Sequence, residues 1–203
     1  MLLEALAKFR IAPSDAVMGI ELMRRAVDLF WDPEEGGFLD TVPDPGAFGY
    51  LSRKRRLNDD TGYPALNAVA ALTLDRLWLH TGDAAYHDRA EECLKLLISA
   101  TDKVDHRHGG LGLAIDAHLR RPTRYVVIGE DDSARVGSLA DAAWKVFDPG
   151  KLVIHLRPGR DDERIAALET EPPEGAHLLV CAGAKCSSAT TTVEGIDSLS
   201  VPR

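Results

Sequence analysis

Acidic, aromatic and amide side chains gather between two long predicted helices, and they are the first candidates for chemistry in this chain. The candidates are Asp40, Asp60, Tyr63 and Asn67. Carboxylates beside an aromatic ring and an amide are typical of sugar recognition, and a carboxylate pair could perform general acid–base catalysis. We therefore interpret these four residues as a substrate-binding set. The alternative is a solvated acidic turn that caps the helix beginning near Pro64.

Two cysteines near the C-terminus form a second candidate site. Cys181 lies at the end of a predicted strand and Cys186 in the turn after it, with four residues between them. His177 shares a face of that strand with Cys181, which gives three ligands at most, and we expect no zinc site. A redox pair usually has two intervening residues, so we treat Cys181 and Cys186 as a thiol pair. A disulfide, and buried packing of Cys181, are the alternatives.

Two further clusters favour structural interpretations. Residues 129–132, Gly-Glu-Asp-Asp, lie between a strand and a helix, where a glycine-rich turn would hold phosphate. Three acids occupy the place of the phosphate, so this segment indicates a helix N-terminus favoured by the helix dipole. Residues 105–108, Asp-His-Arg-His, could supply metal ligands, but an exposed polar loop is the commoner origin of such a run. We expect neither a metal nor a cofactor.

Composition excludes several classes of protein. The chain has 203 residues, 45% of them hydrophobic, and a formal net charge of −8, which would repel nucleic acid. The basic run at residues 53–56 is typical of a solvated loop or edge strand. No apolar run approaches the ~18 residues of a membrane span, and the N-terminal residues lack the order of a signal peptide. With three cysteines, the chain is expected in a reducing cytoplasm.

The first part of the chain has helical periodicity. Apolar residues recur at three- and four-residue steps over residues 16–31, 64–80 and 84–100. Gly82 and Asp83 suit a C-cap followed by an N-cap, so the second and third of these helices should pack antiparallel. Shorter helices are predicted over residues 2–9 and 111–119, and a long β-hairpin over residues 36–57. We assign residues 1–121 to one helical-hairpin unit with a β-hairpin insertion.

The remainder alternates strand and helix. Strands are predicted over residues 125–128, 151–156 and 176–182, and helices over 133–147 and 161–168. Short links between such elements favour right-handed crossovers and parallel strands. We therefore expect residues 122–203 to form a small three-stranded parallel α/β unit.

Several short segments, taken in order, resemble one family. It comprises bacterial and animal thioredoxin-domain proteins fused to a six-hairpin, glycosidase-like helical toroid, and it includes the spermatogenesis-associated thioredoxin-like proteins. The matching segments span most of the chain: Phe30-Trp31-Asp32, Gly36-Gly37-Phe38, Asp40-Thr41, Asp60, Pro64, Asn67, Val69-Ala70-Ala71, Thr81-Gly82-Asp83, Tyr86, Arg89-Ala90-Glu91, Asp116, Pro122, Val126-Val127-Ile128-Gly129, Val180-Cys181 and Cys186.

The resemblance implies a fold that is mainly α with an α/β part. A partial α/α toroid of antiparallel helical hairpins would precede the small sheet, and the family's thioredoxin domain and first hairpins would be absent. It implies a carbohydrate-related domain that binds a sugar ligand rather than catalysing a reaction, and no catalytic residue is assigned. One alternative is an interaction or scaffold protein, which associates with itself or with a protein partner covering exposed helix faces. The other is a thiol or redox protein; no nucleic-acid or membrane partner is expected.

Overall fold

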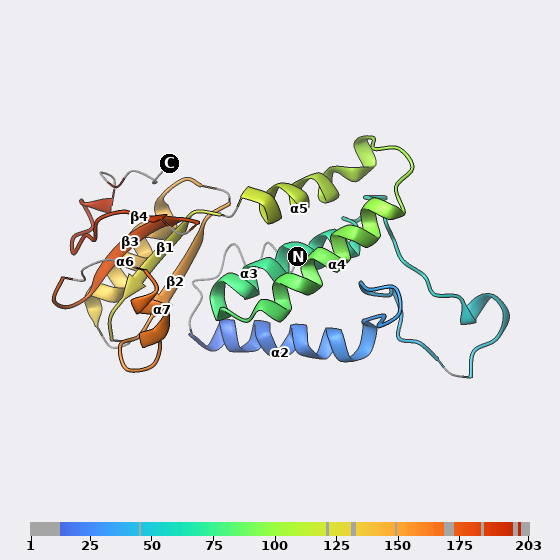
Figure 1. The fold of residues 1–203 in the computed structure, drawn as a ribbon, viewed down its shortest axis with the longest axis horizontal. Helices are drawn as coiled ribbons and strands as arrows, with labels where there is room; N and C mark the ends of the chain where they lie inside the picture. The colour runs from blue at the N-terminus through green and yellow to red at the C-terminus, as the bar shows by residue number, and fades with distance from the viewer. Residues whose placement is uncertain are drawn as a thin grey trace. The chain divides into compact units, whose positions relative to one another are not determined.

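The computed structural model describes residues 13–44, 46–120, 122–130, 133–148, 150–168, 173–183, 185–196 and 199. The helix predicted over residues 2–9 lies outside them. The chain divides into two compact units, Met1–Leu119 and Arg120–Arg203, where the sequence analysis placed the boundary after residue 121. Figure 1 shows helices in the first unit and a small sheet with helices in the second.

The helical unit contains four α-helices and two short 3-10 helices in its described residues. Two of its helices form an antiparallel hairpin around Gly82 and Asp83. Gly82 ends the first helix: its φ is 80°, in the left-handed region, and its backbone N–H bonds to Trp78 O. Asp83 begins the second, since its carboxylate accepts from Ala85 N. This is the cap pair that the sequence predicts. In chain order the elements are α2 (Pro13–Phe30), η1 (Gly49–Ser52), α3 (Leu66–Thr81), α4 (Ala84–Ser99), η2 (His106–His108) and α5 (Gly109–Arg120).

Small residues on α3 let its neighbours pack closely. Ala68, Ala71 and Leu74 are fully buried, and they meet Ala90 and Leu97 of α4 in one apolar core. Alanines add little side-chain volume and favour the helix, so this face combines high helix propensity with close approach. Each fully buried leucine contributes roughly 1.5–3 kcal/mol.

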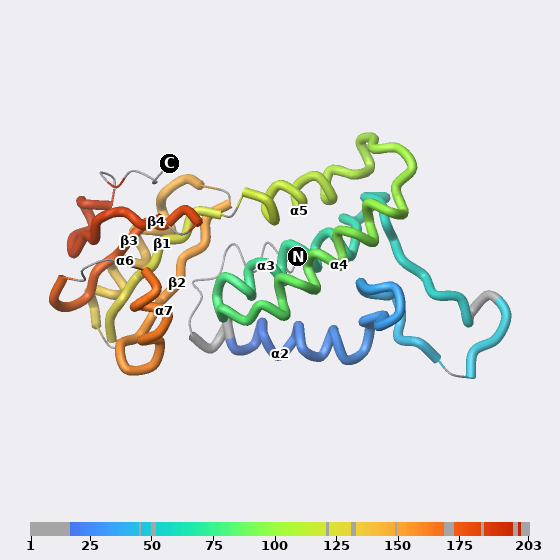
Figure 2. The backbone as a smooth tube through the Cα atoms, in the orientation of Figure 1, coloured from blue at the N-terminus to red at the C-terminus, as the bar shows by residue number. Residues whose placement is uncertain are grey.

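The long β-hairpin predicted over residues 36–57 is wrong for the described part of this segment. There the structure has one isolated bridge, Trp31 to Phe38, followed by loop and η1. Gly37 explains the tight turn: its φ is 73°, and a Cβ there would lie 2.5 Å from Leu96 Cδ2. Figure 2 shows the chain leaving the helices as a long loop before it returns to α3.

Side-chain ion pairs replace the expected strand ladder. Lys54 and Arg56 both contact the buried carboxylate of Asp32, and a backbone bond joins Asp40 N to Arg55 O. A strand pair needs a repeated backbone ladder, and this segment closes through charge instead.

The second unit carries a four-stranded mixed sheet with the order β2-β1-β3-β4. Strands β1 and β2 are parallel, as predicted, but β3 is antiparallel to both β1 and β4. The prediction of a three-stranded parallel sheet is therefore wrong in strand number and in the direction of β3. The elements are β1 (Arg124–Ile128), α6 (Ala134–Lys145), β2 (Leu152–Leu156), α7 (Asp162–Ala166), β3 (His177–Ala182) and β4 (Lys185–Cys186).

The physical reason lies in the connections. A run of apolar residues predicts a buried strand but not its direction in the sheet. The direction depends on the connection to the preceding strand. The link from β1 to β2 carries α6, a helix of 12 residues, whereas the described part of the link from β2 to β3 carries α7, a helix of five residues. After β2 the chain re-enters the sheet on the other side of β1, where β3 pairs antiparallel with β1.

The protein is thus mixed α/β, with six α-helices and a four-stranded mixed sheet in its described residues. None of these helices has both the length and the apolar character that crossing a membrane requires.

Candidate metal centre

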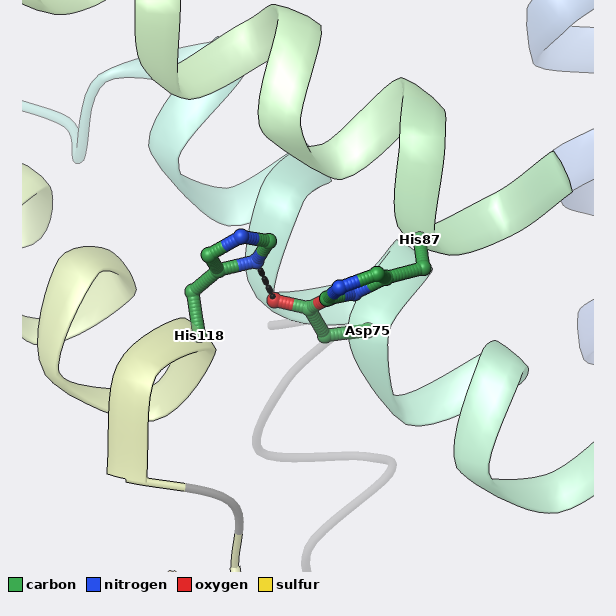
Figure 3. Close-up of side chains that lie close together, drawn as sticks. All are labelled: Asp75, His87 and His118. Atoms are coloured by element: carbon green, nitrogen blue, oxygen red, sulfur yellow. Dashed lines mark hydrogen bonds and ion pairs between the residues drawn. The ribbon is translucent and has the colours of Figure 1, made fainter. Parts of the chain in front are cut away.

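Three helices of the first unit bring together one carboxylate and two imidazoles. Asp75 lies on α3, His87 on α4 and His118 on α5. Both histidines use Nδ1: His87 Nδ1 lies 2.8 Å from Asp75 Oδ1, and His118 Nδ1 lies 2.9 Å from Asp75 Oδ2. Figure 3 shows the two rings converging on the carboxylate. Asp75 is 6% exposed, so the cluster has a buried acceptor and two half-buried bases.

The α3–α4 hairpin accounts for the first contact. Asp75 follows the buried Leu74 on the face of α3 that enters the core. His87 lies one turn into α4, just after the Gly82–Asp83 connection. Because the two helices run antiparallel and closely packed, residues near their shared turn face each other.

The position of α5 depends on Asp60. Its Oδ1 accepts from Ala65 N at 2.8 Å, and its Oδ2 accepts from Gly110 N at 2.6 Å. A carboxylate that caps two helix starts satisfies N–H groups that lack intrahelical partners. Asp60 thereby ties the beginning of α5 to the beginning of α3, and His118 lies further along α5.

Ring stacking orients the imidazoles. The Trp78 and His87 rings are stacked with centroids 4.1 Å apart, and the His87 and His118 rings with centroids 4.5 Å apart and planes 17° from parallel. Because a stacked neighbour blocks each imidazole from turning out of its ring plane, both Nδ1 atoms stay directed at Asp75.

Charge is concentrated around this cluster. A buried carboxylate is costly unless it is hydrogen-bonded, and both Asp75 oxygens have an imidazole partner. Glu91 lies one turn after His87 on α4. A hydrogen bond from Lys95, together with its charge, lowers the pKa of Glu91, and the charges of His118 and His87 add to that shift. The cluster therefore has a second acid nearby.

The donor set suits a divalent transition metal. Imidazole nitrogen and carboxylate oxygen bind Zn²⁺ at ~2.0–2.2 Å, which places neighbouring ligand atoms about 3.3 Å apart in a tetrahedral site. Here the three ligand atoms all lie within 4.8 Å of one another, and the two His–Asp contacts are 2.8 and 2.9 Å. An ion would need these contacts to widen by about half an ångström.

Three of the four residues expected to bind a sugar, Asp40, Asp60 and Asn67, have backbone partners. Asn67 is fully buried, where its Oδ1 accepts from Phe38 N at 2.7 Å and its Nδ2 donates to Phe38 O at 3.0 Å. Asp40 accepts from Leu57 N at 3.1 Å, and Tyr63 is 80% exposed. The structure brings Asp60 and Asn67 to the start of α3, as predicted, but directs their polar atoms at backbone groups.

Of the remaining candidates, Cys181, Cys186 and Asp105 have structural partners. Cys181 and Cys186 form a disulfide between β3 and β4, which was one of the alternatives considered. Asp105 caps η2, and the hydrogen bonds and charge of Arg107 hold the pKa of Asp105 well below its ordinary value. Glu130 is exposed, while residues 131 and 132 lie outside the described residues.

Asp75, His87 and His118 are not predicted as a site by the sequence, because their spacing forms no motif. Twelve residues separate the first pair and 31 the second. One feature of the sequence could have indicated the site: Asp75 lies between the apolar residues Leu74 and Leu77 on the predicted helix. An acid on a buried helix face requires a hydrogen-bond or charge partner. Comparison with known proteins adds no assignment: no protein-family model matches the chain, and no curated protein matches it.

Proposed function

We propose that the helical unit binds a divalent transition-metal ion through Asp75, His87 and His118. The observation that carries the proposal is the convergence of two imidazole Nδ1 atoms and one carboxylate from three different helices. Two nitrogen ligands favour zinc and its neighbours in the first transition row over magnesium or calcium, which prefer oxygen.

The number of ligands indicates the class of site. Structural zinc sites are closed by four protein ligands, whereas catalytic sites have three and keep a position for water. Asp75, His87 and His118 supply three, and His87 and His118 are only partly buried. The site therefore resembles the open type, in which a bound metal would lower the pKa of a water and supply a nucleophile. The chain's own residues would hold the ion and orient the ligand atoms through the Trp78 stack.

Calorimetric titration of the metal-free chain with Zn²⁺ tests the proposal, with Co²⁺ as a spectroscopic substitute. We expect one site per chain and a Co²⁺ spectrum typical of four-coordinate nitrogen and oxygen ligation. Zn²⁺ at a hundred times its Kd should stabilise the folded protein by about 2.7 kcal/mol. Binding should strengthen as pH rises, because the ligands must be unprotonated.

Matched variants locate the site. Asp75→Asn and His118→Gln should each weaken Zn²⁺ binding at least tenfold, since each removes a ligand from a set of three. His106→Gln is the control, because His106 is an exposed histidine on η2. Equal Zn²⁺ affinity in Asp75→Asn, His118→Gln and the unmodified chain would exclude this site.

The functions implied by the resemblance stay proposals beside this one. A carbohydrate ligand draws support from the exposed ring of Tyr63, which is free to pack against a sugar. Isothermal titration with mono- and disaccharides tests it, and a Tyr63→Ala variant that binds them unchanged would remove that support.

A further inference from the structure

A disulfide joins the edge of the sheet to its interior. Cys181 and Cys186 are direct register partners in the antiparallel β3–β4 pair, with Cα atoms 4.0 Å apart. Cys181 is fully buried, whereas Cys186 is half-buried on β4, which ends the strand order. Cys186, at the edge of the sheet, is therefore the more exposed residue of the pair.

The hairpin has its own hydrogen bonds and does not depend on the sulfur bridge. Ser187 N donates to Val180 O at 2.8 Å, and Val180 N donates to Ser187 Oγ at 3.0 Å. Further along, Leu178 and Thr190 exchange two backbone bonds of 2.8 and 2.9 Å. A disulfide stabilises mainly by closing a loop in the unfolded chain, and it does least for short loops. With a sequence separation of 5, reduction should leave both thiols side by side in a folded sheet.

A cation lies beside this bridge. Arg124 on β1 is the register partner of Cys181, so the two side chains leave the same face of the sheet as neighbours. The Arg124 guanidinium donates to the carbonyl of Gly183, in the turn that the disulfide closes. Positive charge next to a cysteine favours its thiolate. Arg124 is thus placed to stabilise the sulfur that leaves when the bridge is attacked.

We propose that Cys181 and Cys186 form a reversible redox site that exchanges with dithiols. A reductant thiolate attacks Cys186 Sγ, the Sγ–Sγ bond breaks, and its electron pair leaves on Cys181 Sγ as a thiolate beside Arg124. The second thiol of the reductant then attacks the reductant's first sulfur in the mixed disulfide, and the Cys186 thiolate is released. Two electrons pass to the protein, both thiolates take the protons given up by the reductant, and the reductant leaves as a disulfide.

The third cysteine, Cys93, should not interfere with alkylation measurements on this pair. Cys93 is buried in the core of the helical unit, and this burial raises the pKa of its thiol to about 12. Its thiol should therefore resist alkylation in the folded protein, so any alkylated cysteine reports on the pair.

The experiment uses the full chain under native conditions. The protein is reduced with dithiothreitol, re-oxidised with glutathione disulfide, and alkylated at each stage for mass spectrometry, while circular dichroism follows the fold. We expect Cys186 to be alkylated after reduction and not after re-oxidation, with an unchanged spectrum, while the buried Cys181 and Cys93 react only on denaturation. Reduction that requires denaturant, or that unfolds the sheet, would overturn the proposal and leave a structural disulfide.

Variants test the role of Arg124. Arg124→Gln should slow reduction several-fold, because the leaving thiolate loses its cation, and Arg124→Lys should restore most of the rate. Arg135→Gln, an exposed arginine on α6, is the control. Equal rates for Arg124→Gln and Arg135→Gln would overturn the assignment of Arg124. The outcome is independent of Zn²⁺ binding, since the metal ligands lie in the other unit.

Discussion

Two carboxylates of the helical unit differ in what their oxygens meet. Both oxygens of Asp75 contact imidazole nitrogens, and these contacts need to widen by about half an ångström to admit an ion. Both oxygens of Asp60 accept backbone N–H groups, of Ala65 and Gly110, whose positions are fixed by α3 and α5. At the scale of single residues, the first arrangement suits ligand exchange and the second suits structural support.

Asp60→Ala should therefore destabilise the helical unit. The variant leaves two helix-start N–H groups without their charged acceptor, at a cost of about 2 kcal/mol or more. Thermal and urea unfolding measure this cost. Asp59→Ala is the matched control, because the partners of the Asp59 carboxylate are the side chains of Thr61 and Arg107 rather than backbone N–H groups of a helix start, and this variant should lose much less. If Asp60→Ala instead abolished sugar binding at an unchanged melting temperature, the expected ligand site would be right and the capping role wrong.

At the scale of elements, Lys151 holds the end of α6 against the start of β2. Its ammonium donates to Ala143 O at 2.8 Å and Trp144 O at 2.7 Å, and also contacts Val146 O. These carbonyls lie at the end of the helix, where intrahelical donors are missing and the dipole is negative. Burial lowers the pKa of Lys151, while the charge of Asp148 opposes that shift.

Lys151→Met should weaken this junction by about 2 kcal/mol, since methionine keeps the aliphatic stem and removes the donors. Hydrogen-exchange mass spectrometry of peptides from α6 and β2 measures the local effect. Lys145→Met, an exposed lysine in the last turn of the same helix, serves as the control. Faster exchange in both variants alike would show that general charge near the helix end matters, rather than the specific bonds of Lys151.

At the scale of the whole molecule, stability should fall in acid because of Asp32. Its burial raises the pKa, but hydrogen bonds from Lys54 and Glu34 N and the charges of Lys54 and Arg56 outweigh that, so the pKa lies below its ordinary value. An acid with a depressed folded-state pKa adds stability that is complete above its unfolded-state pKa of about 3.9. That stability is lost as the pH falls from there through the lower folded-state pKa.

Unfolding free energies measured between about pH 6 and pH 2.5 check this dependence. Asp32→Asn should flatten the acid limb of the curve and lower stability near neutral pH. Asp28→Asn, an exposed acid of α2, should leave the limb as steep as in the unmodified chain. A curve for Asp32→Asn that parallels the unmodified chain down to the lowest pH would contradict the role given to Asp32.

The sequence by itself determined most of the local elements. The three- and four-residue apolar steps predict α2, α3 and α4 to within a few residues, and Gly82 and Asp83 predict the turn between α3 and α4. These features are local, because capping and helix periodicity depend on residues within one or two turns. The apolar runs likewise predict β1, β2 and β3.

Tertiary structure decided what those elements do together. The direction of β3 is set by its connection, and the loop before α3 closes through charges on Lys54 and Arg56 that a strand pattern does not reveal. Asp75, His87 and His118 meet only because three helices pack around one core, and no sequence spacing encodes that meeting. Local rules specify helices and caps, whereas a site assembled from side chains far apart in sequence exists only once the packing of the helices is known.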